Sequence, residues 1–173
     1  MIETNFIKLY EKSFHENWDL PAFTDLSEST TTTYGEFANN IARLHILFEE
    51  MGIKNKDKIA LIGRNHTAWA SIFMATITYG AVIVPILHEF HPDSMENIVL
   101  HSDAKLIFIE DNILRKLNTD KLIQPIITIP NWEVINRHSS KTDSLKITVD
   151  KKFADKHPNG FKPSHIQYSR VHN

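Results

Sequence analysis

The fold is decided by residues 58–110, which read KIALIGRNHTAWASIFMATITYGAVIVPILHEFHPDSMENIVLHSDAKLIFIE. Short apolar runs, typical of buried parallel strands, alternate here with longer segments of helical periodicity. The stretch predicts strands at 58–62, 81–85 and 105–110, separated by helices over about 66–79 and 92–102. Asn65 is placed to cap the first helix, and Pro92 lies in the first turn of the second. Because strand–helix–strand crossovers are right-handed, we expect an α/β fold with a layered, mostly parallel sheet flanked by helices.

The residues before this stretch predict an N-terminal helix and a β-hairpin. An amphipathic pattern covers residues 4–18, and β-branched residues then flank a polar turn at 27–29. Thr33 and Glu36 match the capping-box pattern at the start of a further helix. Gly52 follows that helix, at a position where a left-handed backbone favours glycine.

The regular alternation ends after a last strand at 124–129, so we expect an N-terminal α/β subdomain over residues 1–130. Residues 131–173 are expected to form a polar connecting segment with one short helix at 148–157. This tail is basic, since residues 136–173 hold 8 Lys/Arg against 3 Asp/Glu, whereas residues 1–135 hold 11 against 18. The tail could bind a phosphate or nucleic acid, or dock against the acidic remainder of the chain.

Composition narrows the classes of function. The 173 residues carry a net charge of −2, which argues against a general nucleic-acid binder. The absence of cysteine excludes disulfides, cysteine nucleophiles and cysteine-ligated zinc. The uncharged run between Arg64 and Glu89 contains Gly80 and Pro85, so a buried helix and strand explain it better than a membrane span. No signal peptide is visible, and we expect a cytoplasmic location.

Motifs for phosphate binding or nucleophilic catalysis are missing from these residues. The five glycines cannot form a dinucleotide or Walker loop, and Gly63, between a strand and a helix, is best interpreted as a tight connection. No serine lies in a nucleophile elbow. The adjacent carboxylates Glu110 and Asp111, at a strand end, are expected on a solvated face.

Two histidines are the local candidates for a binding site. His88 and His91 follow the strand at 81–85, at the sheet edge where α/β proteins bind ligands. A metal cluster with His101 is disfavoured, because zinc sites need three or four ligands in a shared geometry. We therefore predict no metal site and no catalytic residue here, and assign His88 and His91 to substrate binding.

Five segments, in order and spacing, resemble the opening of the AMP-forming acyl-CoA synthetases, a superfamily that includes luciferases and peptide-synthetase adenylation domains. They are Thr33-Tyr-Gly-Glu-Phe37, Gly52-Ile-Lys-Asn-Lys-Asp57-Lys-Ile-Ala-Leu-Ile62, Asn65 with Trp69, Tyr79-Gly-Ala-Val-Ile-Val-Pro85, and Ser102-Asp-Ala-Lys-Leu-Ile-Phe-Ile-Glu110. Lys56 departs from the pattern, which usually has glycine there. The compact spacing is most similar to bacterial long-chain fatty-acid–CoA ligases.

The resemblance implies a two-step reaction for the whole enzyme. A carboxylate attacks the α-phosphate of ATP with Mg²⁺, giving acyl-AMP and pyrophosphate, and coenzyme A then displaces AMP to form the acyl-CoA. Its partners would be fatty acid, ATP, coenzyme A and the remaining subdomains of the same polypeptide, and the resemblance is compatible with peripheral membrane association or a homodimer.

The family's Ser/Thr/Gly-rich phosphate loop, its later nucleotide motifs and its small C-terminal domain are absent from this sequence. We therefore expect an N-terminal scaffold fragment that is inactive alone and binds no cofactor. The alternative is a self-standing flavodoxin-like ligand-binding or regulatory module, with a small ligand near Gly63, His88 and His91.

Overall fold

The structure is a computed structural model that describes residues 6–26, 29–129, 134–135 and 142–168. At its centre lies a five-stranded sheet in the order β4-β3-β5-β6-β7. The strands are β3 (Lys58–Ile62), β4 (Val82–Ile86), β5 (Leu106–Glu110), β6 (Ile126–Ile129) and β7 (Val134–Ile135). Strands β3 to β6 run parallel, and β7 is antiparallel to β6. The predicted α/β fold with a mostly parallel sheet is confirmed.

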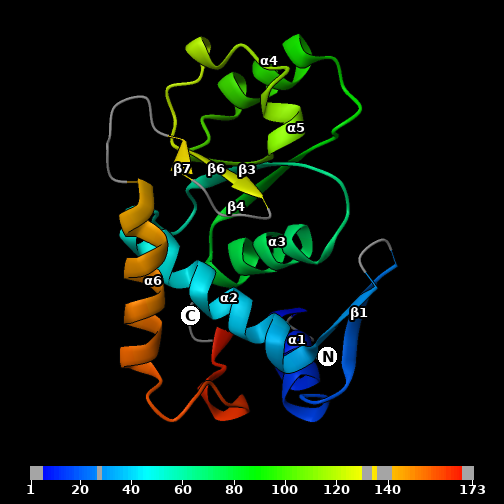
Figure 1. The fold of residues 1–173 in the computed structure, drawn as a ribbon, viewed down its shortest axis with the longest axis vertical. Helices are drawn as coiled ribbons and strands as arrows, with labels where there is room; N and C mark the ends of the chain where they lie inside the picture. Colours follow the sequence, from blue (N-terminus) through cyan, green and yellow to red (C-terminus); the bar gives the residue numbers. More distant parts are fainter. Residues whose placement is uncertain (1–5, 27–28, 130–133, 136–141, 169–173) are drawn as a thin grey trace, which may run out of the picture.

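Helices cover both faces of this sheet (Figure 1). The helices α2 (Tyr34–Glu50) and α3 (Thr67–Tyr79) lie on one face, and α4 (Pro92–Ser102) and α5 (Asp111–Leu114) on the other. Successive strand residues point to opposite faces. Leu61 therefore belongs to the core beneath α2 and α3, whereas Ile62 belongs to the core beneath α4 and α5. The inner strands β3, β5 and β6 are mostly apolar because both of their faces are buried, whereas β4, at the edge of the sheet, is partly exposed.

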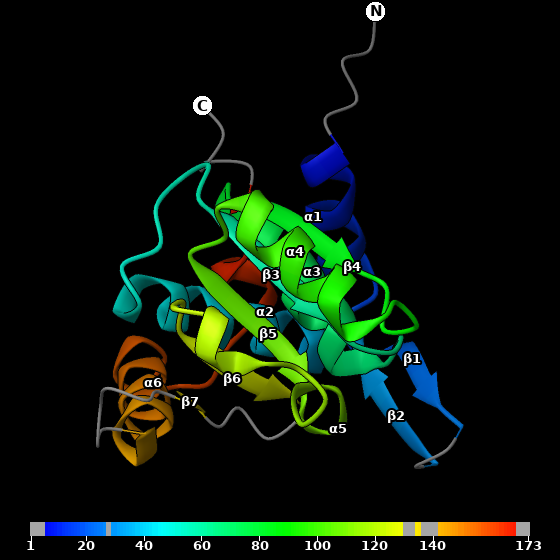
Figure 2. The same cartoon turned by 90° about the horizontal axis from the view of Figure 1, so that it is seen from above.

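The N-terminal elements are α1 (Phe6–Glu16) and a hairpin of β1 (Pro21–Asp25) and β2 (Thr30–Thr33). The predicted capping box is present at the start of α2. The Glu36 N–H donates to Thr33 Oγ1 at 3.2 Å, and the Thr33 N–H donates to Glu36 Oε2 at 2.8 Å. Figures 1 and 2 place the hairpin and α6 (Thr142–Lys156) on opposite sides of the molecule.

The C-terminal region is more regular than the sequence predicted. The stretch 131–147 was expected to be a polar connection, but it contains β7 and the first turns of α6, and α6 extends to Lys156. Leu145, Val149 and Phe153 recur every four residues along α6 and belong to the core on the α2 side of the sheet. This spacing is helical, but Ile147, which is 67% exposed, lies off the buried face and blurs the pattern in the sequence.

Ion pairs join α6 to α2, as expected for a basic tail docking on an acidic remainder. Lys152 pairs with Glu50, Lys156 Nζ lies 3.2 Å from Glu49 Oε2, and Arg43 pairs with Asp150. The Arg43 guanidinium also lies 4.3 Å from the centre of the Phe153 ring. Exposed pairs of this kind add little stability individually, so burial of the apolar face of α6 contributes most of the docking energy.

The uncharged run that raised the question of a membrane span forms α3 and β4. Among the helices in the described ranges, none is long and apolar enough to cross a membrane.

Candidate functional site

The carboxyl ends of β3, β4 and β5 form the edge of the sheet where ligands bind in α/β proteins. Residues 63–66 connect β3 to α3, residues 87–91 connect β4 to α4, and β5 passes directly into α5. The described side chains at this edge fall into two groups, one around Glu110 and one along the loop after β4.

Glu110, the last residue of β5, organises the loop after β3. Its carboxylate accepts the backbone N–H of Arg64. Arg64 Nε lies 3.5 Å from Glu110 Oε2, and His66 Nε2 lies 3.6 Å from Glu110 Oε1. The side chain is only 12% exposed, so the expectation of a solvated carboxylate is wrong for Glu110. Its burial is tolerated because hydrogen-bond donors surround the charge.

Gly63 makes room for this carboxylate. A Cβ atom at Gly63 would lie 3.1 Å from Glu110 Oε1 and 3.2 Å from Ile129 Cδ1. The close approach of the two strand ends therefore explains the glycine, as expected for a tight connection.

His66, rather than the predicted Asn65, caps α3. Its Nδ1 accepts the backbone N–H of Trp69 at 3.2 Å. Because Nδ1 accepts this bond, the neutral ring carries its proton on Nε2, the atom that faces Glu110. The two residues thus connect the end of β5 to the start of α3.

A cleft of about 990 Å³ opens beside these residues, between the sheet edge, α2, the hairpin tip and α6. Arg43, Arg64 and Lys146 supply its positive charge, and its carboxylates include Asp25 and Asp150. Apolar residues such as Leu47 and Ile129 also line it. A cleft of this size could hold an organic ligand, but the balanced charges favour neither an anion nor a cation.

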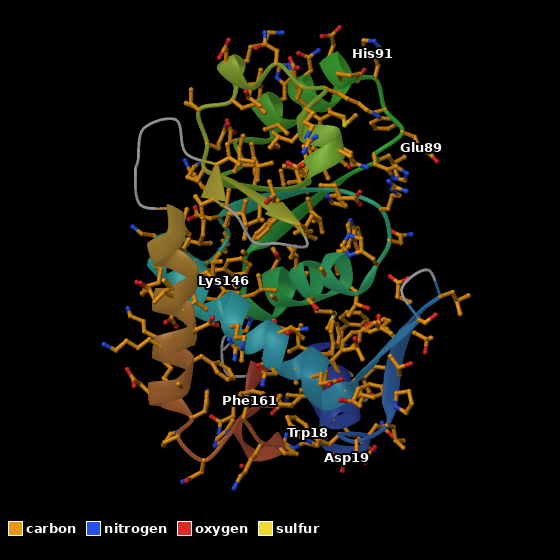
Figure 3. The ribbon with its side chains drawn as sticks, viewed as in Figure 1. Trp18, Asp19, Glu89, His91, Lys146 and Phe161 are labelled. Atoms are coloured by element: carbon orange, nitrogen blue, oxygen red, sulfur yellow. The ribbon has the colours of Figure 1, made fainter. Side chains whose placement is uncertain are left out.

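His88 and His91 lie outside this cleft, on the loop after β4. His91 occupies the N-cap position of α4 without a side-chain capping bond, and its Nδ1 lies 3.5 Å from Asp93 Oδ2. Figure 3 places Glu89 and His91 at the outer margin of the molecule. Among the described residues, no three or more His, Cys, Asp or Glu side chains are grouped so as to hold a metal ion.

Residues 10–169 match the sequence profile of a family described as "AMP-binding enzyme". The chain belongs to the AMP-binding enzyme family. It is 29% identical over 85 residues to 4-hydroxybutyrate–CoA ligase 2 of Metallosphaera sedula, a match covering 49% of this chain and 16% of that protein. It is 26% identical over 120 residues to long chain acyl-CoA synthetase 4 of Arabidopsis thaliana, which covers 66% of this chain and 18% of that protein. The chain thus spans less than a fifth of either relative.

Solved structures of AMP-binding enzymes have the same fold. An anthranilate CoA ligase in complex with anthranoyl-AMP superposes with a TM-score of 0.67 at 15% identity, over 73% of this chain and 25% of the other. A benzoate CoA ligase from Burkholderia xenovorans LB400 superposes with a TM-score of 0.65 at 18% identity, over 83% of this chain and 28% of that chain. A structure described as the N-terminal domain of a Mycobacterium tuberculosis protein superposes with a TM-score of 0.59 at 20% identity, over 65% of this chain and 30% of that chain. The fold is therefore that of the N-terminal region of adenylate-forming ligases.

Sequence reasoning missed the role of Glu110 and the cleft beside it. The signal was Gly63 after one strand and Glu110 at the end of another. The two residues come together because β3 pairs with β5. Neither residue is informative without the strand order.

Proposed function

We propose that this chain is the N-terminal scaffold of an ATP-dependent ligase that joins a long-chain fatty acid to coenzyme A. The carboxylate would first attack the α-phosphate of ATP, forming acyl-AMP and releasing pyrophosphate. The coenzyme A thiol would then displace AMP and form the thioester. The family match over residues 10–169 carries this proposal, and the similarity to long chain acyl-CoA synthetase 4 supports the choice of acid.

The scaffold role follows from the side chains available. Magnesium prefers several oxygen ligands in an octahedral arrangement, and in the described ranges no three or more His, Cys, Asp or Glu side chains are grouped so that they could hold a metal ion. The connection at Gly63 is not glycine-rich, so it does not form a cradle of N–H groups for a triphosphate. We therefore derive no step through ATP or Mg²⁺ on these residues and propose that this chain alone binds no cofactor.

We assign a substrate contact to His88 and His91. They lie beyond the carboxyl end of β4, a position suited to ligand binding. His91 makes no side-chain capping bond, so alanine there leaves the start of α4 intact. In the intact enzyme, His88→Ala and His91→Ala should raise KM for the acid or coenzyme A. His101→Ala, at the far end of α4, is the matched control; equal effects from all three substitutions would remove the assignment.

The reaction is tested by ATP–pyrophosphate isotope exchange on two proteins. One is expressed from the full reading frame of the gene, and the other is the 173-residue chain. The intact protein should exchange pyrophosphate only when a fatty acid is present and should form a thioester when coenzyme A is added. The chain alone should be silent. Exchange by the chain would disprove the scaffold role, and a folded but silent intact protein would disprove the ligase.

A ligand-binding module is the second candidate, and the cleft beside Arg64 is the observation that favours it. A thermal-shift measurement on the chain with ATP, coenzyme A and fatty acids distinguishes the two. A shift that is lost in Arg64→Ala but kept in Arg115→Ala would support the module. No shift with any of them is the outcome expected for the scaffold.

A further inference from the structure

The end of the described chain folds back as a short segment, residues 157–168, which we name the C-terminal hook. It follows α6, contains one turn of 3₁₀ helix (Pro163–His165), and ends at the buried Tyr168. Phe161 in the hook faces Trp18, which lies between α1 and β1, and their ring centres are 6.0 Å apart. Figure 3 shows these two labelled side chains near each other at one end of the molecule. The hook thereby connects the two ends of the described chain.

Two histidine rings form the centre of this contact. The rings of His157 and His165 have their centres 4.7 Å apart. His157 also packs edge-on against Phe161 at 4.9 Å and lies 5.0 Å from the ring of Phe153 on α6. Two imidazolium ions at such a separation would repel each other, and His157 is half-buried whereas His165 is exposed.

Each ring is placed for the neutral form of histidine. His165 Nδ1 accepts the backbone N–H of Lys162 at 2.9 Å, so the lone pair that protonation would occupy is already in use. His157 Nδ1 is buried and has no hydrogen-bond partner among the residues that the structure describes. A proton on that atom would be a buried donor without an acceptor, which is costly.

Burial and the nearest positive charge also favour the neutral form of His157. Burial lowers the pKa of His157, and His165 and Lys156 lower it further. The nearby carboxylate Glu49 is paired with Lys156 at 3.2 Å. Other charged groups on the elements in contact with the cluster include Lys162 in the hook, Arg43 on the Phe153 ring, Asp19 next to Trp18, and Glu11, which acts on Tyr168. The elements α6, α2 and α1 also carry Lys151, Lys152, Asp155, Glu50, Lys12 and Glu16.

We propose that residues 157–165 of the C-terminal hook are a proton-sensitive latch: the neutral ring of His157, packed on His165, holds them against Trp18 and Phe153, and protonation of His157 releases them. This inference goes beyond the proposed ligase function and does not depend on it. Released residues 157–165 would expose the Trp18 and Phe153 rings while the sheet stays folded, because they contribute no strand to it and the buried Ile166 and Tyr168 remain in the core.

The test is an NMR titration of the 173-residue chain from pH 8 to pH 5. The histidine ring protons report protonation, the cross-peak between the Trp18 and Phe161 rings reports docking, and the amides of β3 and β5 report the sheet. We expect the Trp18–Phe161 cross-peak to be lost as His157 is protonated, with the strand amides unchanged.

Two substitutions remove the imidazole rings and keep the packing. His165→Asn retains an acceptor near Nδ1, and His157→Phe retains a ring without the orphaned nitrogen. Each should shift the loss of the cross-peak to lower pH, and the pair together should abolish it above pH 5. His101→Asn, on α4, is the control and should leave the transition unchanged.

Three outcomes would overturn the latch. The cross-peak could persist in the original chain after His157 is protonated. It could disappear at the same pH in the double variant, or it could disappear only together with the strand amides. The single variants keep the test decisive if the double variant does not fold.

Discussion

His45 on α2 binds the backbone of α3, because its Nε2 lies 3.1 Å from the carbonyl oxygen of Ala75. The same nitrogen lies 3.0 Å from Thr78 Oγ1, whose own proton is donated to Met74 O at 2.6 Å. A carbonyl oxygen can only accept, so Nε2 carries the proton of a neutral ring. Burial lowers the pKa of His45 to about 4, against 6.5 for a free histidine.

This shift predicts a loss of stability in mild acid. Below pH 6.5 the unfolded chain binds a proton that the folded chain does not bind until about pH 4. The free energy of unfolding should therefore fall between these two pH values, by about 3 kcal/mol in total. Urea unfolding at a series of pH values measures it.

The pKa of His157 is also lowered, so its protonation would likewise reduce the free energy of unfolding in acid. The control separates this contribution from that of His45. The measurement is made in a His157→Phe background, with and without His45→Gln. The glutamine should lower stability at pH 7.5 and flatten the profile between pH 6.5 and 4. An unchanged slope would show that His45 is not the titrating group.

Gly80 ends α3 in the left-handed region, with φ +84°. Replacing it with valine should cost about 1–3 kcal/mol, because a β-branched residue strains that conformation. Asparagine tolerates the same backbone better, so Gly80→Asn should cost less than Gly80→Val. Thermal unfolding of both variants tests the prediction. Equal melting temperatures for Gly80→Val and the original chain would contradict it.

The sequence predicted those parts of the fold whose signals are local. Both faces of β3 and β5 are buried, so their residues form the unbroken apolar runs that mark parallel strands. The capping box and the glycine after α3 were likewise visible. The start of α6 was not, because its helix is stabilised by packing of Leu145, Val149 and Phe153 against α2 rather than by its own mostly polar sequence.

The candidate site was less predictable because its contacts connect residues distant in sequence. The burial of Glu110 depends on Gly63 and Arg64, which only strand pairing brings near. The choice of His66 over Asn65 as the cap depends on where α3 begins, and helix ends are poorly defined by pattern. The position of His88 and His91 at a strand end was predicted, and their role in substrate binding stays a prediction.

Gly35 and Trp18 are predicted to be energetically coupled. A Cβ atom at Gly35 would lie 2.7 Å from the Trp18 ring. Alanine normally stabilises a helix relative to glycine by about 1 kcal/mol, but here Gly35→Ala should destabilise by about 1–3 kcal/mol through overpacking. The sign of the change therefore decides between the two effects.

A double-mutant cycle with Trp18→Leu measures this coupling. The smaller side chain should leave room for alanine, so the combined cost should be less than the sum of the two single costs. Chemical denaturation of the four proteins gives the coupling energy. If the two costs are strictly additive, the Trp18 ring does not restrict the space for a side chain at position 35.

The cap of α3 gives the last prediction. His66→Ala should destabilise the chain by about 0.5–2 kcal/mol, because the Trp69 N–H then loses its acceptor. His66→Asn should cost less, since its side-chain oxygen can accept the same bond. Asn65→Ala is the matched control and should have little effect, because His66 provides the side-chain cap. Urea unfolding at pH 7.5, together with exchange of the Trp69 amide, distinguishes the two positions. A larger loss from Asn65→Ala than from His66→Ala would show that Asn65 is the cap, as the sequence alone predicted.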